Sequence, residues 1–197
     1  VSAGCYYRLI AANQNTGGQT TQASNLNYLV DVTFSHQQWK GFVFHHQVSY
    51  YKESYEVGST NLFSLNSILE WKWTRRFSFN GGISFLQTPV VGLNGTTILI
   101  ETIATPQIGV GASYLLPQFW NIHPVVGGQL DYMLGGNQNN IQLDSGLAYS
   151  LYAGLEQQVF GQKWTAKTWW SVADLELNSN TQQLTGLGFS LTWNTHF

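Results

Sequence analysis

The chain has 197 residues, enough for one domain, and only 9% of them are Asp, Glu, Lys or Arg, against about 25% in typical soluble domains. The net charge of -2 argues against nucleic acid as a partner, and no run approaches the roughly 20 consecutive apolar residues of a transmembrane helix. The single cysteine, Cys5, excludes an intrachain disulfide and a multi-cysteine metal site.

No signal-peptide pattern is visible at the start of the chain, so we expect Val1 to follow a cleavage site. The four residues 2–5 (SAGC) partly match a lipoprotein processing site, which leaves lipidation of Cys5 as an alternative.

Ten segments show the alternation of apolar and polar residues that is typical of strands with one apolar face. In chain order they are 1–12, 26–35, 42–51, 62–73, 77–87, 98–115, 122–135, 141–158, 164–177 and a last segment that follows residue 183 and ends at 197. Polar loops follow the odd-numbered segments, at 13–25, 52–61, 88–97, 136–140 and 178–183. Short turns follow the even-numbered ones, at 36–41, 74–76, 116–121 and 159–163. This regular alternation predicts an antiparallel meander with the loops at one end and the turns at the other.

The last segment, residues 187–197 (LGFSLTWNTHF), has an apolar face without charge and ends on Phe197. It resembles the C-terminal strand of Gram-negative outer-membrane β-barrel proteins, although Thr195 stands where that signature usually has an apolar residue. The resemblance implies an all-β, transmembrane, up-and-down antiparallel barrel, most simply of ten strands, as a single domain over 1–197. It also implies the bacterial outer membrane as location, lipopolysaccharide and phospholipid as surroundings, and both termini in the periplasm. A soluble β-sandwich or lipocalin-like barrel would need charged outward faces, which these strands lack.

Six of the eight tryptophans fall near strand ends on the turn side, where an indole ring finds both apolar surface and water. This predicts a periplasmic aromatic girdle that consists of Trp39, Trp71, Trp73, Trp120, Trp164 and Trp193.

The face opposite the apolar one carries ionisable residues, which we expect to point into the barrel: Arg8, Asp31, His45, Glu70, Lys72, Asp131, Glu156 and Lys167. The near balance of their signs favours a structural network that fills a small interior, and the alternative is an ion- or solute-selective constriction. Large inward residues such as Tyr152 and Trp169 oppose many inward glycines and serines, which predicts either complementary packing or a narrow water-filled path.

Small residues also occur on the outward face, and they define either a groove for a partner protein, a second copy or a specific lipid, or a random scatter: Gly81, Ala104, Ala112, Gly128, Ala153 and Ala166. No His is predicted to meet an acid or a Ser near the loops, so we expect neither an enzyme nor a cofactor or metal site, with an outer-membrane hydrolase as a minor alternative. The sequence favours a structural or interaction role with an occluded or very narrow interior, for the barrel alone or as the anchor of a larger assembly. The main alternative is a narrow porin-like channel.

Overall fold

The computed structural model describes the backbone of residues 2–13, 20–39, 41–55, 58–94, 97–138, 141–159, 162–177 and 180–194. It describes the side chains of residues 41–50, 52–53, 59–90, 100–136, 142–159, 163–177 and 181–191. Over this part of the chain, no helix has the length and apolarity that crossing a membrane requires.

The described residues form strands joined by short connections. The strands are β1 (Ser2–Asn13), β2 (Thr20–Trp39), β3 (Phe42–Tyr55), β4 (Gly58–Lys72), β5 (Phe77–Asn94), β6 (Thr97–Leu115), β7 (Ile122–Met133), β8 (Gly136–Gln138), β9 (Ile141–Val159), β10 (Gln162–Leu177) and β11 (Asn180–Asn194).

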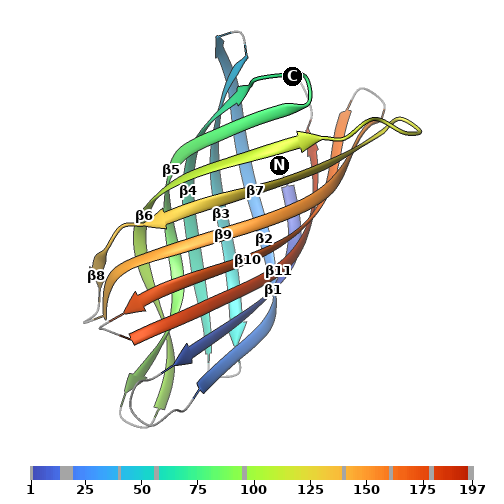
Figure 1. Cartoon of the computed structure of the whole chain (residues 1–197). Coiled ribbons are helices and arrows are strands. Elements are labelled where there is room, and N and C mark those ends of the chain that lie inside the picture. The colour runs from blue at the N-terminus through green and yellow to red at the C-terminus, as the bar shows by residue number, and fades with distance from the viewer. Residues whose placement is uncertain are drawn as a thin grey trace.

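The pairing of the strands is antiparallel throughout, and it curls the sheet around a central space (Figure 1). The order is β10-β11-β1-β2-β3-β4-β5-β6-β7-β9-β8, and β10 also pairs with β9. Each of the longer strands therefore has a hydrogen-bonded neighbour on both sides, and β1 lies between β2 and β11. The three residues of β8 continue the pairing of β7 along β9.

The strands reach further toward the loops than the sequence pattern predicts. β2 begins at Thr20 rather than at residue 26, the β5–β6 ladder extends to Asn94 and Thr97, and β8 lies inside the predicted loop 136–140. The predicted loops were therefore too long. The reason is that backbone hydrogen bonds need no apolar face, so polar residues continue a ladder that has already formed.

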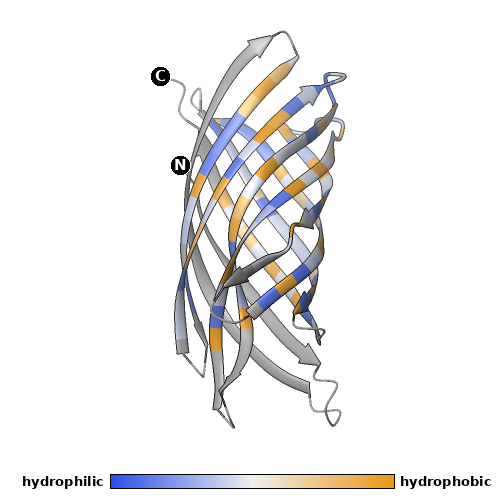
Figure 2. Cartoon of the chain, turned by 90° about the vertical axis from the view of Figure 1, so that its left-hand side faces the viewer, coloured by the Kyte–Doolittle hydropathy of each residue, from blue (hydrophilic) through white to orange (hydrophobic). Residues whose placement is uncertain are grey.

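Hydrophobic and hydrophilic residues alternate along many of the strands (Figure 2), and their exposure alternates as the sequence predicts. On β9, Leu151 and Leu155 are 58% and 47% exposed, whereas Tyr152 and Glu156 between and beside them face the interior and are half-buried. Among the described residues of the strands, the charged side chains at outward positions lie toward the loop ends: Lys52, Asp144, Asp174 and Glu176. Between the two ends, the outward face is predominantly apolar and carries no Asp, Glu, Lys or Arg in the described part of the chain.

An apolar cluster occupies the interior near the loop ends, which the sequence analysis did not predict. It joins six strands through residues that are between 1% and 9% exposed: Val90, Ile103, Met133, Leu143, Ala173, Leu175, Leu177 and Leu184. A β-bulge helps to build it, because Glu176 pairs with Ser145 while the next residue pairs with Leu143, which leaves Asp144 as the extra residue. Leu62 of β4 is also fully buried.

Candidate functional site

The large inward side chains lie over glycines of neighbouring strands. Trp169 pairs with Gly188 of β11, and a Cβ at Gly188 would lie 2.5 Å from the ring atoms Cε2 and Cη2 of Trp169. Tyr152 covers its partner Gly127 in the same way, and the carboxylate of Asp131 covers its partner Gly109. Large residues therefore pack against small ones along the wall, which matches the complementary packing predicted from the sequence.

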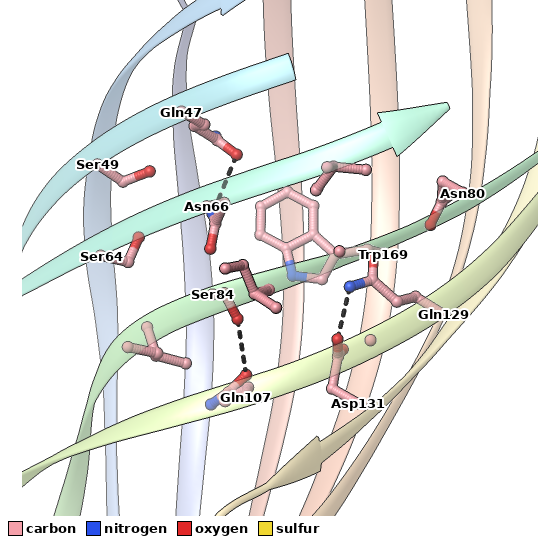
Figure 3. A pocket seen from close by; sticks show the side chains of 15 residues that line it. Gln47, Ser49, Ser64, Asn66, Asn80, Ser84, Gln107, Gln129, Asp131 and Trp169 are labelled. Carbon is pink, nitrogen blue, oxygen red and sulfur yellow. Dashed lines mark hydrogen bonds between the residues drawn. The ribbon is translucent and has the colours of Figure 1, made fainter. Parts of the chain in front are cut away.

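A polar cavity of about 300 Å³, here called the central chamber, lies in the interior beside Trp169 and Asp131 (Figure 3). Its walls are rich in amides and hydroxyls, with one carboxylate and one indole ring: Gln47, Ser49, Ser64, Asn66, Asn80, Ser84, Gln107, Gln129, Asp131 and Trp169. Some of these groups bond to each other. Asn66 Nδ2 donates to Gln47 Oε1 at 3.2 Å, and Gln129 Nε2 donates to Asp131 Oδ1 at 2.7 Å.

Toward the turns, the central chamber adjoins a cavity of about 370 Å³ that shares Gln47, Asn80 and Gln129 with it and contains most of the ionisable groups. A further cavity of about 640 Å³ at the turn end shares Glu156 and Lys163 with that one. The described interior thus forms a series of cavities from the turn end inward.

Toward the loops, the central chamber adjoins a cavity of about 390 Å³ that shares Gln107 and Trp169 with it and is bordered by members of the apolar cluster. Buried polar atoms without a hydrogen-bond partner gather at this inner end, namely Gln107 Nε2, Thr105 Oγ1 and Thr88 Oγ1. Gln107 is 5% exposed and Thr105 is fully buried. These groups and the apolar cluster form the inner end of the series.

The structure brings together some of the predicted interior charges. His45 Nε2 lies 3.1 Å from Glu70 Oε2, and Lys167 lies over the Tyr152 ring with its Nζ 4.9 Å from the centroid. Glu156 forms its ion pair with Lys163, at 2.7 Å.

Two further residues of the predicted charge set, Lys72 and Asp131, do not take part in these contacts. Lys72 is exposed at the turn end, and Asp131 lies apart in the central chamber beside Gln129. The side chains of Arg8 and Asp31 lie outside the described residues. The sequence analysis placed Lys163 in a turn and so missed its pair with Glu156. The predicted turn extended to residue 163, whereas β10 already begins at Gln162, so Lys163 is part of the strand.

Of the predicted girdle, Trp71, Trp73 and Trp120 lie at the turn end and are 43%, 62% and 91% exposed. Trp71 stacks on Phe79 with ring centroids 5.9 Å apart. Trp164 lies near the start of β10, while the side chains of Trp39 and Trp193 lie outside the described residues.

The predicted outward groove is only partly continuous. Ala112 pairs directly with Gly128, and Gly81, Ala153 and Ala166 lie at similar distances from the turn ends of their strands. Ala104 lies further toward the loops, where it pairs with Gln87. At Gly128 a Cβ would meet Leu151 Cδ2 at 3.0 Å, so Leu151 occupies the space beside this glycine.

Two contacts bear on hydrolytic chemistry. In the interior, the Glu70 carboxylate bonds to the His45 imidazole at 3.1 Å, while the nearby Ser78 hydroxyl bonds to Ser113 at 2.7 Å. On the outward face, His46 Nδ1 lies 3.0 Å from Ser67 Oγ, in the apolar band. The described residues contain no group of three or more His, Cys, Asp or Glu that could hold a metal ion. The expectation that the chain is not an enzyme stays a prediction.

No protein-family model matches the chain, and no curated protein matches it. Solved structures of outer-membrane β-barrel proteins are similar to it. An outer membrane channel from Pseudomonas putida is 8% identical, with 97% of this chain and 95% of that one covered and a TM-score of 0.47. The NanC porin is 10% identical, with 97% and 98% covered and a TM-score of 0.47. The outer membrane protein OprG from Pseudomonas aeruginosa is 10% identical, with 96% of each chain covered and a TM-score of 0.39. Identities and TM-scores of this size assign no activity to the chain.

Proposed function

We propose that the chain is a closed ten-stranded β-barrel of the Gram-negative outer membrane, with its loops outside the cell and its turns and termini in the periplasm. The uncharged apolar outward face supports this, because in water it would be a large exposed apolar patch. The pairing of β1 with β11 supports closure, which leaves no free sheet edge in the lipid. β1 begins and β11 ends at the turn end of the sheet, because Ser2 pairs with Thr192.

The proposed role is that of a non-conducting barrel, with a structural or interaction function on its own or as the anchor of a larger assembly. The observation that carries this proposal is the apolar cluster at the loop end of the interior. Ions cross a pore with water around them, and a constriction lined by Leu, Ile, Val and Met excludes that water. The polar cavities on the turn side would then form a blind chamber that opens toward the periplasm.

A narrow channel is the second candidate, and the series of polar cavities favours it. If the apolar cluster rearranged, these cavities would supply most of a path for ions or small polar solutes. The two functions therefore differ in whether the apolar cluster blocks the interior at the loop end or rearranges to open it.

Planar-bilayer recordings separate the two. We expect no stable discrete currents from the wild type. We expect discrete currents from the double variant Met133→Ala and Leu175→Ala, because it removes two large side chains from the cluster. Leu187→Ala is the matched control, because Leu187 is 58% exposed on the outward face of β11. Discrete wild-type currents that change when Glu70 and Asp131 are neutralised would overturn the occluded barrel and favour the channel.

A further inference from the structure

The inner end of the central chamber is unusual because it contains buried polar atoms without a hydrogen-bond partner, although Gln107 Oε1 accepts from Ser84 Oγ at 3.4 Å (Figure 3). Gln107 is only 5% exposed and lines the central chamber, and its Nε2 has no hydrogen-bond partner. Thr88 Oγ1 also lacks one, and Thr88 borders the adjoining cavity. A buried donor without a partner costs roughly 1–3 kcal/mol, so native structures rarely keep such a group unless something binds it.

The rest of the chamber suits a molecule with many hydroxyl groups. The amides of Asn66, Asn80 and Gln129 offer both donors and acceptors, and the hydroxyls of Ser49 and Ser84 do the same. None of the described residues that line the chamber is a Lys or Arg, and its one carboxylate, Asp131, is bonded only to a neutral amide in the described contacts. This composition disfavours an anion.

Trp169 adds an apolar surface. One side of the indole lies over Gly188, so the ring is held along the wall of β10 and β11 and borders the chamber (Figure 3). A pyranose ring has an apolar face of C–H groups and a rim of hydroxyls, which this combination of an indole and amides complements. The volume of about 300 Å³ is at the lower end of the range for small-molecule sites.

We propose that the central chamber binds a neutral polyhydroxylated ring of monosaccharide size, which enters from the turn end. Trp169 packs against its apolar face, and Gln107 Nε2 donates a hydrogen bond to its rim. The blind chamber belongs to the proposed non-conducting barrel, so this inference rests on that proposal.

Saturation-transfer NMR titrations of the full chain test the inference. The chain is folded in an oligo-ethylene-glycol ether detergent, because alkyl glycoside detergents carry a sugar headgroup that would compete. The probes are D-glucose, myo-inositol and D-glucuronate. We expect saturable binding of at least one neutral probe, and at least tenfold weaker binding of glucuronate.

The variants Gln107→Leu and Trp169→Leu should each weaken the binding of the neutral probe about tenfold. Thr168→Val should leave it unchanged, because Thr168 precedes Trp169 but is exposed on the outward face. The difference in electrophoretic mobility between unheated and heated samples reports folding for each variant. The inference is overturned if the folded wild type binds neither neutral probe, if glucuronate binds as tightly, or if both interior variants bind like the wild type. A wild type that conducts but still binds the sugar would overturn the non-conducting barrel and leave the sugar site in place. A wild type that neither conducts nor binds a sugar would overturn only the sugar site.

Discussion

Replacing Gly188 by Ala tests whether the indole of Trp169 depends on the glycine beneath it. The three atoms nearest to an added Cβ at Gly188 all belong to the Trp169 ring, and two of them would lie at 2.5 Å. Carbon atoms pack at about 3.5–4.0 Å, so the ring would have to move by about 1 Å or more from its place on the wall. Overpacking of this kind costs about 1–3 kcal/mol. A glycine in a strand is otherwise about 0.5–1 kcal/mol less favourable than Ala, so the backbone gain partly offsets this cost.

Gly81 supplies the matched control, because a Cβ there would meet Gly109 O at 3.6 Å and Val110 Cγ1 at 3.9 Å, which are ordinary contacts. We expect Gly81→Ala to leave the free energy of unfolding unchanged or to raise it by up to about 1 kcal/mol. We expect Gly188→Ala to lower it by about 1–2 kcal/mol net of the backbone gain. Reversible urea unfolding in lipid vesicles measures both. In the background Trp169→Leu, the penalty of Gly188→Ala should largely disappear. Equal effects of the two single substitutions would refute the packing argument.

Further variants test the outward face and the turn end of the interior. Ile83→Arg should lower the free energy of unfolding by about 2–4 kcal/mol, because Ile83 is 66% exposed near the middle of the apolar outward face. Gln183→Arg, at the loop end of the same face, should lower it by less than about 1 kcal/mol. Similar costs at both sites would contradict a lipid-facing band. Lys163→Met breaks the ion pair with Glu156. Because the Lys163 side chain is 47% exposed, the free energy of unfolding in the same urea assay should change by less than about 1 kcal/mol. A larger loss would mean that the pair is shielded from water.

The direction in which the strand residues face could be predicted because it depends on local alternation alone. Ile108 and Val110 are exposed and Gln107 and Gly109 are buried as the pattern predicts, since successive side chains of a strand point to opposite faces. The same reasoning placed His45 and Glu70 on one face of adjacent strands, where the structure joins them. It did not give the ends of the strands, because these depend on pairing rather than on an apolar face.

The apolar cluster could not be predicted from alternation. Val90 lies in a segment whose Pro and Gly content indicated a loop, and the structure makes it part of β5. Leu143 has the same parity as the outward Leu147, and only the bulge at Asp144 turns it inward. A bulge leaves no mark on hydrophobic periodicity, so the convergence of these residues could not be predicted from the pattern of apolar residues.

The width of the interior could not be predicted from the sequence, because it depends on the direction of the large side chains rather than on their volume. The sequence analysis opposed large inward residues such as Tyr152 and Trp169 to inward glycines and serines, and it left complementary packing and a narrow water-filled path as alternatives. In the structure, Tyr152, Trp169 and the carboxylate of Asp131 lie along the wall over the glycines that pair with them, and the glycines permit this position. A large residue that lies flat takes space from its neighbour on the next strand and little from the centre. The pairing of large residues with glycines therefore leaves the central chamber open at the level where Tyr152 and Trp169 are found. A glycine alone does not decide the outcome, because Met133 and Leu175 both pair with Gly146 and yet belong to the apolar cluster, where further apolar side chains of neighbouring strands fill the interior beside them.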